Sequence, residues 1–433
     1  MVTGDLMNTS LRRSSYKWSV QALTFLLISL LPFGASAQRL LEYRSQVPVI
    51  DYAQSANDAF TRLFEAIDAG DVSIAYQGER GYLDELLEAL HISPSSQVMV
   101  FSQTALKGRL ISPETPRAIY FNDEVYVAYV AGTPSLEIAS MDAVIGPTFY
   151  EIPLEPDADI ELRRHTSRCL NCHVDNHLSN GGSPIFTMHS ALTNAEGNVY
   201  FARDSEFASN STMPLEQRWG GWYVTGMHGD QLHRGNVFFP SPRTDILDRI
   251  ADGNRASLED LFDTSPYLSS YSDIVALLVM QHQVDVQNEI ARVNYQVRTI
   301  AEREGTLTAE ELAEQSEPLL RAMFMSGEAP LTDTVEGVSG FTEYFQSLGP
   351  FDGYGRSLRE FDLQTRVFTY PLSYLIYSEA FDALPEQVLA YISRRADKIL
   401  SGTDQTQAYA HLSDLDRSSI RAILQETKPG FLD

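Results

Sequence analysis

Both cysteines of this 433-residue chain lie in the short segment Ser167–His173. Cys169 and Cys172 are three positions apart and His173 follows directly, so the segment reads C-x-x-C-H. Two thiols at this spacing can bond to the same group, and a neighbouring imidazole can coordinate a metal. Because the chain has no other cysteine, its core cannot depend on a set of disulfides. The fold must instead place Cys169, Cys172 and His173 where they can bind a common group.

The spacing C-x-x-C-H is typical of covalent haem attachment. Two thiols three positions apart can add to the two vinyl groups on one edge of a haem, and the next residue can offer an imidazole to the iron. In Cys169–His173 the chain resembles the c-type cytochromes. The resemblance implies one haem c, with thioether bonds from Cys169 and Cys172 and with His173 as the axial ligand. More diffusely, the whole chain resembles large mono-haem bacterial cytochrome c domain-containing proteins, which implies no substrate.

Two other uses of the motif stay open. A thioredoxin-like redox pair usually opens a helix after a strand and depends on a lowered thiol pKa, whereas the acidic, helix-compatible run Pro156–Arg168 leads into this motif. A zinc ion could instead bind Cys169 and Cys172 together with two histidines. The candidates for that role are His165, His173, His177 and His189.

The first 37 residues have the three parts of a secretory signal peptide. Arg12, Arg13 and Lys17 form a basic start, Ala22–Leu31 is a short apolar run, and Ala35–Ala37 is a small-residue cleavage site. The apolar run is short for a membrane span, so we expect cleavage and no stable membrane insertion afterwards. We therefore expect a periplasmic or otherwise exported protein, which suits the resemblance because c-type haem is attached outside the bacterial cytoplasm.

The composition describes a globular, acidic protein. Hydrophobic residues make up 43% of the chain and charged residues 21%, which is enough apolar material for a large core. The formal net charge is −26, and removal of residues 1–37, with three basic residues and one acidic residue, would make it −28. Such a surface repels nucleic acid phosphates and anionic lipid and attracts basic proteins. We expect no nucleic acid partner and a redox partner with a basic docking face.

The order of predicted elements indicates an α+β fold. After the signal peptide, residues 1–37, we expect an α+β region over 38–155, a loop-rich cytochrome c-like haem region over 156–245, and a mainly helical region over 246–433. Apolar spacing predicts helices within 51–70, 82–91, 274–304, 308–324, 340–347 and 385–400. Extended apolar and aromatic runs predict a small antiparallel sheet from 98–101, 118–121, 125–130, 136–139 and 149–152.

The sixth iron ligand would decide the function, because a second strong protein ligand favours electron transfer and an open position permits substrate chemistry. Met213 precedes Pro214, which resembles the axial methionine of many small cytochromes c. His228 and His233 lie close together in a glycine-containing segment, and His282 lies on the apolar stripe of the predicted helix 274–304. These four are the main candidates. Met188, His189 and Met227 are further possibilities.

The sequence therefore favours a periplasmic c-type cytochrome that carries one covalent haem and transfers electrons. The first alternative is a haem-dependent redox enzyme, with peroxidase-like or small-molecule oxidation chemistry. The second is a non-redox zinc or ligand-binding protein. No glycine-rich phosphate loop, G-x-S-x-G elbow or H-E-x-x-H motif is present, so the catalytic residues of an enzyme stay unknown.

Overall fold

The computed structural model describes residues 50–105, 107–156, 160–174, 182–200, 208–241 and 253–432. The expected signal peptide, residues 1–37, lies outside the described residues. The described residues belong to one compact unit, which spans Val47–Asp433. The regions expected over 156–245 and 246–433 therefore share this unit with the preceding α+β region.

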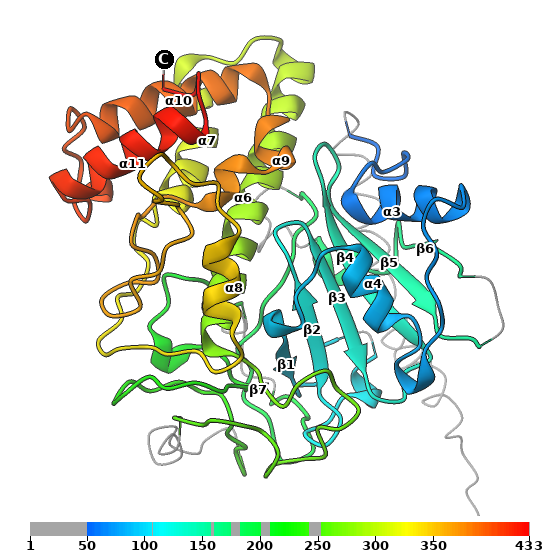
Figure 1. The fold of residues 1–433 in the computed structure, drawn as a ribbon. Helices are drawn as coiled ribbons and strands as arrows, with labels where there is room; N and C mark the ends of the chain where they lie inside the picture. The colour runs from blue at the N-terminus through cyan, green and yellow to red at the C-terminus, as the bar shows by residue number, and fades with distance from the viewer. Residues whose placement is uncertain are drawn as a thin grey trace, which may run out of the picture. The chain divides into compact units, whose positions relative to one another are not determined.

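A seven-stranded antiparallel sheet forms the centre of this unit, with the strand order β6-β5-β4-β3-β2-β1-β7 (Figure 1). The strands are β1 Val98–Val100, β2 Arg117–Phe121, β3 Val125–Val130, β4 Ser135–Asp142, β5 Gly146–Pro153, β6 Arg163–Arg164 and β7 Trp222–Tyr223. The strands β1 to β5 confirm the predicted runs. Each of the strands β2 to β5 pairs with the strand that precedes it in the chain. The turn between β2 and β3 is closed by the side chain of Asn122, which accepts from the backbone amides of Glu124 and Val125.

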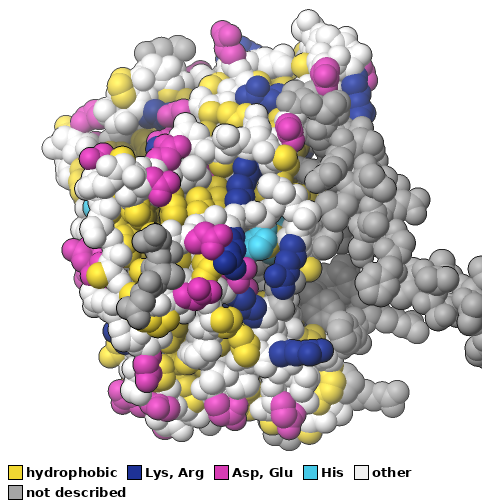
Figure 2. Space-filling model, turned by 90° about the vertical axis from the view of Figure 1, so that its right-hand side faces the viewer, with side chains coloured by type: hydrophobic (Ala, Val, Ile, Leu, Met, Phe, Trp, Pro, Cys, Tyr) yellow, Lys and Arg dark blue, Asp and Glu magenta, His cyan; other side chains and the backbone are white. Residues whose placement is uncertain are grey.

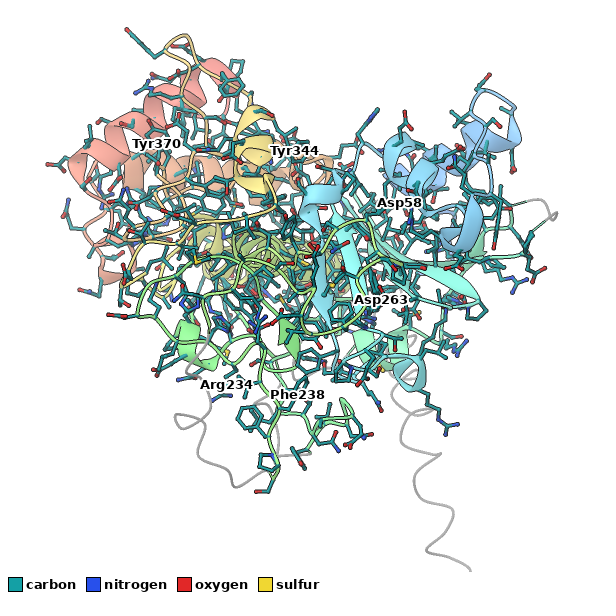
Figure 3. The ribbon with its side chains drawn as sticks, turned by 60° about the horizontal axis from the view of Figure 1, so that its bottom comes forward. Asp58, Arg234, Phe238, Asp263, Tyr344 and Tyr370 are labelled. Carbon is teal, nitrogen blue, oxygen red and sulfur yellow. The ribbon has the colours of Figure 1, made fainter. Side chains whose placement is uncertain are left out.

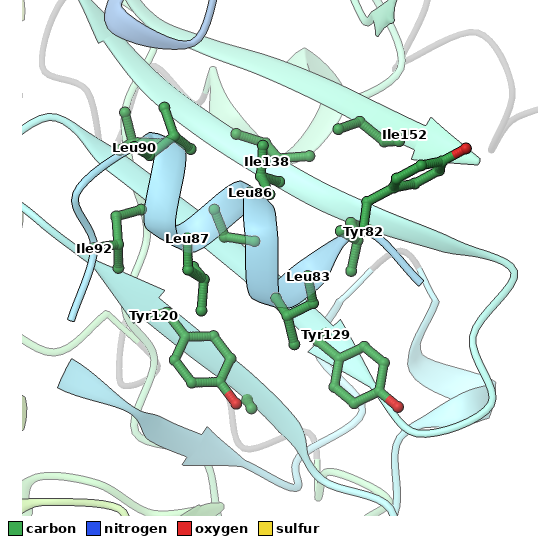
Figure 4. Close-up of a cluster of buried hydrophobic side chains, with 14 of the residues drawn as sticks. Tyr82, Leu83, Leu86, Leu87, Leu90, Ile92, Tyr120, Tyr129, Ile138 and Ile152 are labelled. Atoms are coloured by element: carbon green, nitrogen blue, oxygen red, sulfur yellow. The ribbon is translucent and has the colours of Figure 1, made fainter. Parts of the chain in front are cut away.

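The alternation of side chains along these strands gives the sheet two different faces. One face packs against α3 (Ala59–Asp68) and α4 (Leu83–Ala89), with Leu83, Leu86 and Leu87 of α4 set on strand residues (Figure 4). The strand side chains of this cluster include Tyr120, Val127, Ile138 and Ile152. The residues between them, such as Ile119, Ala128, Ala139 and Phe149, line a cavity on the other face.

Asp58 joins α3 to the sheet (Figure 3). It is 1% exposed and caps the helix, because its Oδ1 accepts from the amide of Thr61 at 2.9 Å. Its other carboxylate oxygen accepts from the hydroxyls of Thr148 and Tyr150 on β5. A carboxylate buried this deeply is stable only with such partners.

The long helix α6 (Ile274–Glu304) packs beside the sheet and also contacts helices of the C-terminal part (Figure 1). Its start is capped by Asp273, which accepts from the amide of Val275 at 2.8 Å, and its polar side chains reach the β2–β3 turn and Tyr126. The helices that follow are α7 Ala309–Met323, α8 Phe341–Ser347, α9 Glu379–Asp382, α10 Glu386–Leu400 and α11 Asp414–Thr427. The helices expected over 274–304, 308–324, 340–347 and 385–400 are confirmed, and α11 is an addition.

Little regular structure occurs between β6 and α6. Among the described residues of this stretch, the helix α5 (Leu170–His173) and the strand β7 are its named regular elements apart from a single 3-10 turn. Pairing of Met99 with Tyr223 and of Val100 with Trp222 attaches the stretch to the sheet edge. The fold is thus α+β, as expected, with N-terminal helices, an antiparallel sheet, a loop-rich centre and a helical C-terminal part. No described helix is long and apolar enough to cross a membrane.

Candidate functional site

The C-x-x-C-H motif forms one helical turn. The backbone amides of Cys172 and His173 both donate to the carbonyl of Cys169 at 3.0 Å. Residues three and four positions apart lie on the same side of a helix, so the two thiols and the imidazole point the same way. Leu170, 3% exposed, anchors the opposite side of the turn. Cys169, Cys172 and His173 consequently all line one cavity.

This cavity has a volume of about 200 Å³ and lies on the sheet face opposite α3 and α4. Its floor is apolar and comes from β2 to β5, including Ile119 and Ala139. Its walls include Met188 and Trp222 from the loop-rich stretch and Met280 from α6. Pockets for drug-sized ligands typically measure about 300–1,000 Å³, so a tetrapyrrole needs room beyond this cavity. Cys172 is exposed and marks an open side.

The ring of His173 is held in one tautomer. Its Nδ1 is 2.9 Å from the carbonyl oxygen of Ile185, which can only accept, so Nδ1 carries the proton and Nε2 keeps its lone pair. The ring packs on Phe149, with 4.3 Å between the ring centroids. Burial lowers the pKa of His173 to about 4. His173 is therefore neutral at pH 7. Its backbone hydrogen bond uses Nδ1, so the lone pair of Nε2 can bind a metal.

The two cysteines are free thiols. Burial raises the pKa of the Cys169 thiol to about 12. A redox-active cysteine requires a lowered pKa and an electropositive setting. The surroundings of Cys169 therefore raise the thiol pKa, whereas those of a thioredoxin-like pair lower it.

Charged side chains surround the mouth of the cavity. Lys107 lies 2.9 Å from Glu151 and 3.7 Å from Glu137, and His165 Nε2 is 3.1 Å from Glu151. Burial acts to raise the pKa of Glu151, but hydrogen bonds from Lys107, Ser135 and His165 lower it to about 2. Arg117 and Arg168 also line the cavity. Although the chain is acidic as a whole, basic side chains gather around a histidine on the face shown in Figure 2.

None of the four main candidates for the sixth ligand is among the described residues that line this cavity. Met213 is half-buried in a turn, where its carbonyl accepts from Arg218 Nε at 2.7 Å. His282 is 1% exposed on α6, and both ring nitrogens have partners: Nδ1 is 2.7 Å from Glu328 Oε1 and Nε2 is 2.9 Å from Ser373 Oγ. The expected burial of His282 is confirmed, and its hydrogen bonds account for it without a metal.

His228 and His233 form a buried pair elsewhere in the loop-rich stretch. They are 2% and 0% exposed, their ring centroids are 4.8 Å apart, and Trp219 packs on His233 at 5.7 Å. Within the described residues, both ring nitrogens of His228 and Nε1 of Trp219 have no hydrogen-bond partner, while the backbone of Gly253 is a partner of His233. Each buried polar group left unpaired costs about 1–3 kcal/mol, so this cluster is an unusual feature.

Three other side chains line the cavity instead, two from one loop segment and one from α6. Met188 and Met280 are each 3% exposed, and His189 is half-buried. Burial, and then the nearby charge of Arg117, lower the pKa of His189. His189 and His173 line the same cavity. The sequence offered Met188 and His189 only as further possibilities and did not indicate Met280.

A second cavity, of about 480 Å³, adjoins the first. The segment Phe186–His189 and Val284 of α6 line both cavities and thus form the wall between them. The second cavity has a mixed lining of apolar and polar side chains, and the polar ones include His282, Asp285 and Glu328. Burial raises the pKa of Asp285 to about 6.

The zinc alternative has little support in the described residues, where no three His, Cys, Asp or Glu side chains gather into a metal-binding group. His177, one of its candidate ligands, lies outside the described residues. The chain matches no family model, and no curated protein and no solved structure is similar to it. The chemistry of the site therefore has to be argued from its own residues.

Proposed function

We propose that this protein is an exported c-type cytochrome that carries one haem c and transfers electrons. The observation that supports the proposal best is the state of His173. Its ring is neutral, its proton is held on Nδ1 by the Ile185 carbonyl, and its free Nε2 belongs to the same cavity as two unoxidised thiols of one helical turn. Axial histidines commonly donate their other nitrogen in this manner, which orients the ring and makes it a better ligand.

In this proposal Cys169 and Cys172 form the two thioether bonds and His173 binds the iron. A bound haem supplies a reversible one-electron couple. The apolar floor from Ile119, Ala139 and Phe149 excludes water, and Ile185 holds the His173 proton in place. Lys107 and Arg117 lie at the cavity as ion pairs with Glu151, at 2.9 Å, and with Glu137, at 3.5 Å, so the carboxylates of a haem would compete with these partners for the positive charge.

We assign the sixth position to His189, with Met188 and Met280 as the other possibilities. All three line the cavity of His173, whereas Met213, His228, His233 and His282 do not. Burial lowers the pKa of His189, so its ring is neutral at pH 7, the form that binds metals. Loss of the methionine-to-iron absorbance band in Met188→Ala or Met280→Ala would shift the assignment from His189 to that methionine.

The direct test is a pyridine haemochrome assay combined with intact mass measurement, on protein produced with the cytochrome c maturation machinery. The wild-type chain should carry covalent haem with a two-thioether spectrum. Cys169→Ser and Cys172→Ser should each give a one-thioether spectrum or lose the haem, while His411→Gln, an exposed histidine far along the chain, should behave like wild type. A wild-type protein without covalent haem would refute the proposal.

The charge around the cavity bears on the redox partner. The net charge of −26 predicts attraction of a basic partner, whereas the described cavity lining carries Arg117 and Arg168 beside Glu137 and Glu151, with Lys107 paired to both of these glutamates. We propose that a basic partner is steered by the whole surface and docks beside this cluster rather than on it. Electron-transfer rates with a basic partner should fall as salt rises. A rate that is independent of salt would contradict steering.

The adjoining cavity of about 480 Å³ favours a haem-dependent enzyme as the second candidate. This space beside the proposed sixth position could hold a small substrate, and Asp285, with its pKa raised to about 6, could exchange a proton there. Titration of the ferric protein with cyanide and with peroxide separates the two functions. A six-coordinate iron that reacts with neither supports electron transfer, and rapid binding of either supports the enzyme.

A further inference from the structure

The two residues Ile185–Phe186 connect the C-x-x-C-H motif to α6, although they belong to no helix or strand of the described structure. Ile185 uses both of its backbone groups on His173. Its amide donates to the carbonyl of His173 at 2.9 Å, and its carbonyl lies 2.9 Å from Nδ1 of the ring. Because the two residues are 12 positions apart, this pairing is not a local turn. The orientation of the His173 ring therefore depends on where the Ile185 carbonyl is held.

Phe186 uses its two backbone groups in the opposite direction, on the side chain of Asn288. Its amide donates to Oδ1 of Asn288 at 2.8 Å, and its carbonyl accepts from Nδ2 at 3.0 Å. A side-chain amide offers a donor and an acceptor as a peptide group does, so Asn288 takes the place of a neighbouring strand. Adjacent residues of an extended chain direct their backbone groups to opposite edges, which matches this arrangement. Ile185–Phe186 thus links His173 to α6 through hydrogen bonds on both edges.

The orientation of the Asn288 side chain follows from these contacts. If its amide were turned over, Nδ2 would face the Phe186 amide and Oδ1 would face the Phe186 carbonyl, so two donors and two acceptors would meet. Asn288 is half-buried on α6, whose 31 residues give it a rigid base. Tyr126 and Phe149 also pack on the Phe186 ring, at centroid distances of 5.0 and 6.3 Å. Such ring contacts hold the side chain, whereas the two hydrogen bonds fix where the backbone groups point.

The far end of the same segment is held by separate partners. The carbonyl of Met188 accepts from the amide of Ser209 at 2.8 Å, and the carbonyl of His189 accepts from Nε1 of Trp222 at 2.6 Å. Loss of the Asn288 side chain would therefore release the end of the segment that faces His173 and leave the end that carries His189 attached.

We propose that Asn288 is a positioning residue for His173. By holding Phe186 it holds the neighbouring Ile185 carbonyl, which keeps the ring proton on Nδ1 and leaves the lone pair of Nε2 available. The binding of iron by Nε2 rests on the proposed function, but the state of the ring does not. Partners that orient a ligating histidine tune both the affinity for the metal and its redox potential. Asn288 would do so from α6, two hydrogen-bonded steps away from the ring.

The first test reads the ring in the full chain, labelled with 15N-histidine and produced without haem attachment. In wild type the nitrogen shifts at pH 7 should show the Nδ1–H tautomer of His173, whose signals His173→Gln identifies. Asn288→Leu removes both hydrogen bonds and keeps a side chain of similar size. It should mix the tautomers and speed exchange of the Nδ1 proton by about tenfold or more, because two ordinary hydrogen bonds lost together amount to at least that factor.

Asn294 provides a matched control on the same helix. Its Nδ2 donates to the carbonyl of Val144 at 2.9 Å, and its Oδ1 accepts from Nε of Arg298 at 2.7 Å. Asn294→Leu thus makes the same chemical change and also removes two hydrogen bonds. It should lower the melting temperature at least as much as Asn288→Leu does, while the His173 ring stays as in wild type. An equal change of the ring in both variants would show a general loosening and overturn the positioning role.

The second test uses the protein after haem attachment. Asn288→Leu should raise the reduction potential and Asn294→Leu should leave it unchanged, because a histidine whose Nδ1 proton is held by a carbonyl is the better ligand and favours ferric iron. If the haem-free chain does not fold, this measurement decides alone. A wild-type chain without covalent haem would refute the proposed function and leave the ring test valid. A His173 ring that is the same in wild type and Asn288→Leu, or an equal potential in the two, would overturn the inference about Asn288.

Discussion

Asp285 offers a prediction whose size follows from its surroundings. It lies on α6 at the wall of the larger cavity, where its Oδ2 accepts from the amide of Ser211 at 2.7 Å. Burial raises its pKa from an ordinary value of 3.8 to about 6, the charge of Glu328 adds to this, and the bonds from Ser211 and the charge of His282 oppose it. The folded protein thus holds this proton at pH values where the unfolded chain has lost it.

The sign of the effect follows from proton binding. Between about pH 4 and pH 6 the folded state binds more protons at Asp285 than the unfolded state, so this residue makes folding less favourable as pH rises. A shift of about 2 pKa units corresponds to about 3 kcal/mol, which is fully lost above the folded pKa. Asp285→Asn has no such proton to lose and keeps an oxygen for the Ser211 amide. It should be more stable than wild type by up to about 3 kcal/mol at pH 8, and equal to it at pH 4.

Guanidinium chloride unfolding of wild type and Asp285→Asn at pH 4, 5, 6, 7 and 8 measures this difference, as a change in midpoint at constant slope. Glu343→Gln on α8 is the matched control, because this carboxylate is exposed. The control should show no comparable gain. An Asp285→Asn protein that is no more stable than wild type at pH 8, or whose advantage persists unchanged at pH 4, would refute the reasoning.

Other predictions concern the core, the start of α6 and the proposed iron ligand. Leu86→Ala removes a side chain that is 0% exposed between α4 and the sheet, and should lower the free energy of unfolding by about 2–5 kcal/mol in a denaturant titration. Asp273→Ala should cost about 2 kcal/mol or more by the same measurement, because the carboxylate accepts from Val275 and also from the amides of Val338 and Ser339. His189→Ala should convert the proposed six-coordinate haem into one that binds cyanide quickly, and an unchanged spectrum would exclude His189.

Several elements follow from local sequence because their cause is local. The helix 274–304 combines an N-cap aspartate with apolar residues at threes and fours over its whole length, and the structure has it at Ile274–Glu304. The runs that became β2 and β3 are rich in aromatic and β-branched residues and are joined by an asparagine turn. The helix α11 also had such signals, a capping box from Ser413 to Asp416 followed by apolar spacing, and could have been predicted.

Other elements depend on contacts between distant parts of the chain. β6 and β7 are two residues long, which is too short for any periodicity, and β7 exists because Trp222 and Tyr223 pair with β1. The cavity around His173 combines strand residues, the segment Phe186–His189 and Met280 of α6. Spacing along the chain could not indicate that His189 lines the same cavity as His173 and that Met213 does not. The sequence determined the three side chains of the C-x-x-C-H motif and most long elements, because these depend on neighbours a few positions away. Only the tertiary structure decided what faces the motif, because burial and packing bring together side chains, such as Phe149, His189 and Met280, that no local pattern connects.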